Sequence, residues 1–189
     1  MERTQPRRTS GQPTNMNLRE KLCRSVQGKV VVMGIGNRCR GDDAAGSCVA
    51  QQISSAPGLH IIDAQDVPEN YLCQVADQKP DTVVLIDCVD LKSEPGSVAL
   101  LEKNETMAFW PRTHRVPMSL IVNYLAGTTD ARILLIGIQP QQTDFLQPVS
   151  ADVLSSVEVV ARVLNEIFQS RRITASEHCA NPLRKEVTA

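Results

Sequence analysis

Three residues in this sequence, Asp43, Asp87 and His114, are of the types that hold divalent metal ions or transfer protons. Two carboxylates and one imidazole form a donor set that suits a first-row divalent ion such as nickel or zinc, with positions left open for other ligands. Alternatively, Asp43 and Asp87 could converge as an aspartic-protease dyad. The separations between the three residues carry no local signature, so their types alone leave both kinds of chemistry open.

Each candidate also has a purely structural interpretation. Asp42 and Asp43 stand where a helix is expected to begin, and Asp42 could cap its N-terminus, whereas Asp43 is freer to face a crevice. Asp87 ends an apolar run, where a buried carboxylate is costly unless it is paired or binds metal, but it could instead cap the following turn. His114 is the only histidine expected in a loop, and a lone loop histidine is more often a surface residue than a ligand.

Compact apolar runs lead up to the acidic positions and are typical of strands buried on both faces of a sheet. The expected strands are residues 29–34, 59–63, 82–87 and 133–137. Segments with helical spacing alternate with these strands, namely residues 43–54, 69–76, 118–125 and 150–168. A further apolar stretch at 97–101 could add an antiparallel strand. This alternation predicts an α/β fold, a three-layer sandwich with a mostly parallel twisted sheet of the phosphorylase/hydrolase-like kind.

The acidic residues cluster where such a fold binds ligands. An open parallel sheet takes ligands beyond the carboxyl ends of its strands, at the point where the strand order reverses. Segments 36–43 and 87–90 follow the first and third expected strands, and both are acidic. We therefore expect the functional site at this edge of the sheet.

Composition indicates one domain without a general affinity for nucleic acid. The chain has 189 residues, 42% of them hydrophobic, and its 20 Lys and Arg nearly balance 21 Asp and Glu. Aromatic residues make up 3% of the chain, which argues against a base-stacking surface or a ring-lined carbohydrate groove. We expect a disordered extension at 1–15, one domain at 16–170 and a polar tail at 171–189, with either Met1 or Met16 as the start.

Redox and targeting features indicate a cytoplasmic protein. The six cysteines are scattered without a C-x-x-C pair, which favours reduced thiols over a disulfide framework or a zinc knuckle. The polar segment 1–15 lacks the apolar core of a secretory signal, and no apolar run reaches the roughly 18–20 residues of a spanning helix. We expect no membrane insertion, and nothing in the sequence requires more than a monomer.

The segment GIGNRCRGDDAAG also invites a dinucleotide-binding interpretation, because Gly34 and Gly36 follow an expected strand and Asp63 ends the next one. Two features count against it. Cys39 stands where the third glycine of that motif would fall, and two adjacent aspartates occupy the helix start where a pyrophosphate would bind. These carboxylates would repel the phosphates, so a dinucleotide enzyme is the weaker alternative.

An ordered set of motifs resembles the hydrogenase maturation endopeptidase family. No single motif is specific, but their order across residues 28–168 is. The motifs are VVVMGIGNRCRGDD at 30–43, DVPEN at 66–70, VVLIDCVD at 83–90, EPG at 94–96, THRVP at 113–117 and LLIGIQP at 134–140. They are most similar to the branch that processes the large subunits of formate-hydrogenlyase-type and related hydrogenases.

The resemblance implies an endopeptidase that removes the C-terminal extension from the precursor of a [NiFe]-hydrogenase large subunit after nickel insertion. It also implies that Asp43, Asp87 and His114 contact nickel, which the precursor presents and the enzyme does not keep. Whether a nickel-polarised group or a carboxylate base such as Asp43 or Asp87 drives hydrolysis stays open. The other alternative is a non-catalytic protein that binds nickel or escorts the precursor.

The sequence departs from the family pattern near the expected site. Ala44 replaces a glycine that many relatives have after the acidic pair, and Arg115 replaces a small polar residue after the histidine. Cys39 and Cys88 flank the expected site and could touch a thiophilic ion, although packing is the more common role of such cysteines. None of these positions removes a predicted nickel ligand.

Overall fold

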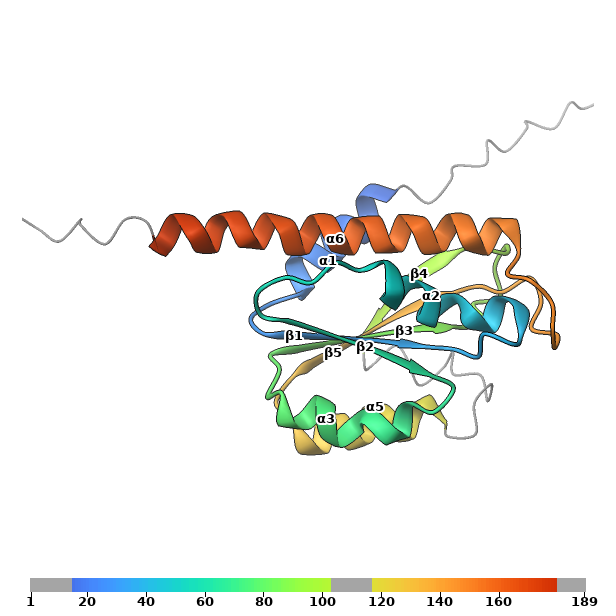
Figure 1. The fold of residues 1–189 in the computed structure, drawn as a ribbon, viewed down its shortest axis with the longest axis horizontal. Helices are drawn as coiled ribbons and strands as arrows, with labels where there is room; N and C mark the ends of the chain where they lie inside the picture. The colour runs from blue at the N-terminus through green and yellow to red at the C-terminus, as the bar shows by residue number, and fades with distance from the viewer. Residues whose placement is uncertain (1–14, 103–116, 180–189) are drawn as a thin grey trace, which may run out of the picture.

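The computed structural model describes residues 15–102 and 117–179, with side chains over 18–102 and 117–171. Five strands form one sheet in the order β2-β1-β3-β5-β4 (Figure 1). The first four in this order run parallel, and β4 pairs antiparallel with β5 at one edge. The strands are β1 (Val30–Ile35), β2 (Leu59–Gln65), β3 (Thr82–Cys88), β4 (Val98–Glu102) and β5 (Arg132–Ile138).

Helices cover both faces of this sheet. Helices α1, α2 and α6 pack on one face, and α3 and α5 pack on the other (Figure 1). The helices are α1 (Asn15–Ser25), α2 (Ala45–Gln52), α3 (Leu72–Asp77), α5 (Met118–Thr128) and α6 (Ala151–Cys179), with short 3-10 helices η1 (Gly41–Ala44) and η2 (Pro68–Tyr71). The predicted three-layer α/β sandwich with a mostly parallel sheet is therefore confirmed, and the added antiparallel strand is β4.

Burial follows the apolar pattern of the strands. Every residue of β1 and β3 is buried, as their largely apolar sequences favour in a sheet covered on both faces. One core cluster joins the sheet to α1, α2 and α6, and a second joins it to α3 and α5. Fully burying one valine, leucine or isoleucine contributes roughly 1.5–3 kcal/mol, so these two aliphatic clusters supply most of the driving force for folding.

The C-terminal helix is longer than its apolar pattern predicts. The pattern ends at Phe168, whereas the backbone of α6 stays helical to Cys179. Residues 169–179 contain neither glycine nor proline, so nothing in their sequence terminates a helix that packing has already nucleated. The segment expected as a polar tail is therefore helical in its first part.

The expected extension at 1–15 lies outside the described residues except for Asn15, which begins α1. Its predicted disorder stays a prediction, as does the division of the chain into an extension, a domain and a tail. Among the helices of the described segments, none combines the length and the apolar character needed to cross a membrane.

Candidate active site

The connection between β1 and α2 places two aspartates at the carboxyl edge of the sheet. Helix α2 packs directly on the strands because Gly46 has no side chain. A Cβ there would lie 2.1 Å from the carbonyl oxygen of Ile86 in β3 and 2.3 Å from that of Ile35 in β1. This close approach seats η1, which precedes α2, beside the ends of both strands. Asp42 and Asp43 lie within η1.

Asp43 is buried, with 4% of its surface exposed. The backbone N–H of Asn37 donates to Asp43 Oδ2 at 3.2 Å. The Asn37 side chain is held in turn, because its amide donates to Asp66 at 3.0 Å and its Oδ1 accepts from the N–H of Cys39 at 2.9 Å. Gly36 permits this turn, since its φ is +148° and a Cβ there would lie 1.9 Å from the carbonyl oxygen of Asp43. The local backbone therefore fixes the orientation of the Asp43 carboxylate.

Asp87 is the penultimate residue of β3 and is 3% exposed. Its Oδ1 accepts a hydrogen bond from the backbone N–H of Cys88 at 2.8 Å. A carboxylate buried at the end of an apolar strand costs free energy that hydrogen bonds or charge partners must offset. The structure thus places Asp87 at the buried strand end that the sequence predicts.

Burial and the neighbouring carboxylates both act on the Cys88 thiol. Cys88 is 1% exposed, and its pKa is raised far above that of an ordinary thiol, first by burial and then by the negative charges of Asp87, Asp43 and Asp42. Geometry agrees, because a Cβ on Gly46 would lie 2.1 Å from the carbonyl oxygen of Ile86, the residue before Asp87, so the segment that carries Asp42 and Asp43 lies beside the end of β3. The same pKa shift keeps the thiol protonated at neutral pH, which favours the packing interpretation of Cys88 over a role as a thiolate ligand.

The third predicted nickel ligand, His114, lies outside the described residues. Within the parts of the chain that the structure describes, no group of three or more His, Cys, Asp or Glu side chains is arranged to hold a metal ion. A nickel site made of Asp43, Asp87 and His114 therefore stays a prediction. Asp90, the other acidic residue after β3, forms an ion pair with Lys92, whose hydrogen bonds lower the pKa of the Asp90 carboxyl.

Asp42 has a different role from the N-cap that its position suggests. Its side chain is fully buried, and neither η1 nor α2 begins with a side-chain cap bond. Its carboxylate instead accepts hydrogen bonds from the N–H groups of Gln141, Gln142 and Ser150 at 2.8, 3.0 and 2.6 Å. The hydroxyl of Ser150 donates a fourth bond at 3.0 Å. The N-cap interpretation is wrong because Asp42 lies inside η1 and not at its start. Its side chain instead links the β1–α2 connection to the β5–α6 connection through these hydrogen bonds.

Comparison with known proteins identifies the family. The family model described as hydrogenase maturation protease matches residues 47–167, which is more than half of the 189-residue chain. The chain belongs to the hydrogenase maturation protease family. The matched range contains Asp87 and the position of His114, whereas Asp42 and Asp43 precede it.

Individual relatives agree with this assignment. A Methanocaldococcus jannaschii protein provisionally named a hydrogenase maturation protease is 32% identical over 155 residues, covering 77% of this chain and 91% of the relative. The hydrogenase 3 maturation protease of Escherichia coli K12 is 26% identical over 69% of this chain and 85% of its own. The crystal structure of the [NiFe] hydrogenase maturation protease HycI from Thermococcus kodakarensis matches with a TM-score of 0.72 and 30% identity, over 81% of this chain and 99% of that one. The maturating endopeptidase HybD from Escherichia coli, with a TM-score of 0.60 and 20% identity, shares the fold.

Membership of the hydrogenase maturation protease family confirms the predicted peptide-bond hydrolase and overturns the dinucleotide alternative. The structure supplies a physical reason. Asp63, which would hold a cofactor ribose in a dinucleotide enzyme, accepts hydrogen bonds from the Ser47 hydroxyl at 2.7 Å and the Gln51 amide at 3.0 Å. It also pairs with the guanidinium group of Arg38. Protein side chains therefore already satisfy the carboxylate that a ribose would need.

Two polar residues that the sequence analysis does not single out shape this protease site. Asn37 orients Asp43, as described above. Gln139 is 8% exposed, and its Oε1 accepts from the N–H groups of Leu91 at 2.6 Å and Ser93 at 3.4 Å. Gln139 thereby holds the connection that follows Asp87. Each lies in a loop directly after a buried strand, in the motifs GIGN and GIQP, and that placement is the sequence signal that could have found both.

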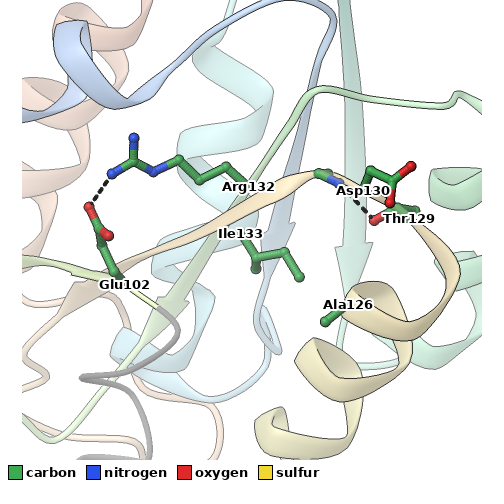
Figure 2. Close-up of a pocket in the computed structure, with 7 residues that line it drawn as sticks. Glu102, Ala126, Thr129, Asp130, Arg132 and Ile133 are labelled. Carbon is green, nitrogen blue, oxygen red and sulfur yellow. Dashed lines mark hydrogen bonds and ion pairs between the residues drawn. The ribbon is translucent and has the colours of Figure 1, made fainter.

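A cavity of about 450 Å³ lies beside the start of β5 and the end of β4, away from the carboxyl ends of the parallel strands (Figure 2). Arg132 at the start of β5 and Glu102 at the end of β4 line it and form an ion pair at 2.6 Å. The end of α5 completes its wall. Because strands of this fold present functional residues at their carboxyl ends, this cavity at the amino end of β5 is not the protease site.

Proposed function

We propose that this protein removes the C-terminal extension from the precursor of a [NiFe]-hydrogenase large subunit after nickel has been inserted. One observation carries the proposal: two buried carboxylates, Asp43 in η1 and Asp87 in β3, lie on adjoining segments at the carboxyl edge of a protease-family sheet. The names of the relatives support the substrate class, because they refer to maturation of hydrogenase 3 and of [NiFe] hydrogenase.

The two carboxylates can supply the proton transfers of peptide hydrolysis. The reaction needs a base that takes a proton from the attacking water and an acid that delivers a proton to the departing amine. An ionised carboxylate that takes the first proton can return it to the amine nitrogen as the carbon–nitrogen bond breaks. The N–H of Asn37 holds Asp43 in one orientation, which suits Asp43 to this role, and Asp87 is then placed to orient the water.

Nickel takes part in this proposal as a component of the substrate. Carboxylate oxygens of Asp43 and Asp87 and an imidazole nitrogen of His114 are donors of the kind that suit a borderline divalent ion. Contact with the nickel of the precursor would align the adjoining tail with the carboxylates. A tail that lacks nickel would lack this alignment, which accounts for processing only after metal insertion. Metal-assisted and carboxylate-based hydrolysis both fit this arrangement.

Burial of the carboxylates restricts the kind of substrate. Asp43 and Asp87 are 4% and 3% exposed, which favours an extended segment of chain over a folded region as the substrate. A protein tail has this shape, and a folded region does not. We propose that the partner is the folded precursor with its extended tail, that the protein acts as a monomer, and that it works in the cytoplasm where the precursor is assembled.

Matched isosteric variants test this proposal. Asp87→Asn removes the charge of a buried carboxylate, whereas Asp130→Asn removes the charge of an exposed one before the amino end of β5. Each variant is incubated with nickel-loaded precursor, and the intact mass of the precursor is followed over time. We expect Asp130→Asn to match the unaltered protein and Asp87→Asn to lose processing by about 100-fold or more while remaining folded by circular dichroism.

The non-catalytic escort alternative predicts a different outcome in the same assay. An escort would bind the precursor without shortening it, even with both carboxylates intact. Equal processing by Asp87→Asn and by the unaltered protein would instead refute the catalytic role of the carboxylates. His114→Ala, measured in parallel, tests whether the residue outside the described segments contributes to processing.

A further inference from the structure

The connection between β5 and α6 runs along the rim of the protease site. We call residues 141–150 the rim loop, which projects beyond the sheet in Figure 1, where it is coloured orange. It packs closely on the start of η1, because a Cβ on Gly41 would lie 3.1 Å from the carbonyl oxygen of Gln142 and 3.6 Å from that of Pro148. The loop is thus in direct contact with the segment that carries Asp43.

Hydrogen bonds hold the rim loop in place at several points. Asp42 accepts four hydrogen bonds from Gln141, Gln142 and Ser150, near the two ends of the loop. At the tip, the N–H of Leu146 donates to the carbonyl oxygen of Cys39 at 2.7 Å. A loop fixed at its ends and its tip presents its remaining side chains in a defined arrangement.

The side chains that the loop presents at its tip are apolar. Phe145 is 61% exposed and Leu146 is 74% exposed, and the two are adjacent. Leu146 also has a φ of +59°, a left-handed backbone conformation that leucine rarely adopts and that glycine or asparagine would adopt more easily. Neither the exposure nor the backbone conformation stabilises the isolated chain. Strain and exposure at one tip are typical of a functional contact.

We propose that Phe145 and Leu146 are a docking contact for the folded body of the precursor, and that they insert into an apolar recess beside the base of its tail. This inference rests on the proposed function. The folded body must lie against the rim of the site when its tail reaches Asp43. The rim loop forms part of this rim, because the N–H of Leu146 bonds to Cys39, four positions before Asp43 in the chain. Paired aromatic and aliphatic anchors on a rigid support are common binding hot spots.

Two variants separate docking from folding. Phe145→Ser removes an exposed aromatic anchor. Leu146→Gly removes the leucine side chain and at the same time relieves the left-handed strain, so it should fold at least as stably as the unaltered chain. Tyr124→Ser is the matched control, because Tyr124 is an aromatic residue that is 40% exposed on α5, which packs on the opposite face of the sheet from α6. Leu146→Met keeps an apolar side chain and should keep the contact.

The measurement is the dissociation constant for nickel-loaded precursor, together with KM and kcat for its processing. Docking predicts that Phe145→Ser and Leu146→Gly each raise the dissociation constant and KM by about tenfold, the effect of losing one buried apolar anchor, with kcat changed less than about twofold. Tyr124→Ser and Leu146→Met should leave both constants within about twofold of the original.

The outcomes also separate docking from the proposed function. If the unaltered protein binds the precursor without processing it, the proposed function fails, and the dissociation constants of the variants still decide the docking claim. If the unaltered protein processes the precursor and both rim variants bind as tightly as it does, the docking claim is overturned while the function stands. Absence of any binding by the unaltered protein overturns both.

Discussion

Replacing Asp42 by asparagine should weaken the fold and the rim loop together. The Oδ2 atom of Asp42 accepts from the N–H groups of Gln141 and Gln142 and from the Ser150 hydroxyl, and Oδ1 accepts from the Ser150 N–H at 2.6 Å. An asparagine has one acceptor oxygen and one donor amide. In either orientation of the amide, at least one backbone N–H therefore faces another donor in a fully buried place.

The size of the effect follows from these contacts. A hydrogen bond to a charged group contributes about 1.5–3 kcal/mol, and a buried donor left without an acceptor costs about 1–3 kcal/mol. Asp42→Asn loses one such bond, and the remaining bonds weaken because their acceptor is no longer charged. Together these losses lower the free energy of unfolding by about 3 kcal/mol. For a domain of this size that loss lowers Tm by about 6–12 °C.

Thermal and urea denaturation of Asp42→Asn measure this loss, with Asp130→Asn as a control because Asp130 is exposed on the connection before β5. The control should change the free energy of unfolding by less than about 0.5 kcal/mol. If Asp42→Asn proved as stable as the control, the assignment of Asp42 as the buried anchor of the rim loop would be refuted.

Two other experiments give independent outcomes. Gly46→Ala should reduce stability by several kcal/mol in urea denaturation, because its Cβ would lie 2.1 Å from a backbone oxygen of β3; a stable variant would contradict the packing of α2. N-ethylmaleimide at pH 7.5 should label exposed Cys39 and spare buried Cys88, because burial and neighbouring carboxylates raise the pKa of the Cys88 thiol. Mass mapping of the labelled peptides measures this difference, and equal labelling of the two cysteines would refute the prediction.

The sheet was predictable because each of its strands coincides with a compact, mostly apolar run in the sequence. Each run between glycine, proline or polar segments became a strand, since a parallel sheet covered on both faces accepts only such sequences. The positions of Asp43 and Asp87 followed from the same logic, because a strand end in this fold lies at the functional edge. The end of α6 was not predictable from its apolar stripe, because a helix continues past its buried face until a residue stops it.

The role of Asp42 could not be derived from local sequence. Its partners, Gln141, Gln142 and Ser150, lie about one hundred positions away in the chain, and only the fold brings them to the same point. An aspartate at a helix start is locally indistinguishable from an N-cap. The placement of Gln139 after a buried strand points to that residue, but its bonds to Leu91 and Ser93 could not be derived locally, because they depend on β5 lying beside β3.

The central claim is that this protease shortens the large-subunit precursor only when nickel is present. The most direct test compares the intact mass of nickel-loaded and nickel-free precursor before and after incubation with the purified protein. Our account predicts loss of one defined C-terminal peptide from the nickel-loaded form and an unchanged mass for the nickel-free form. An unchanged mass for both forms, with a stable complex between the two proteins, would contradict it.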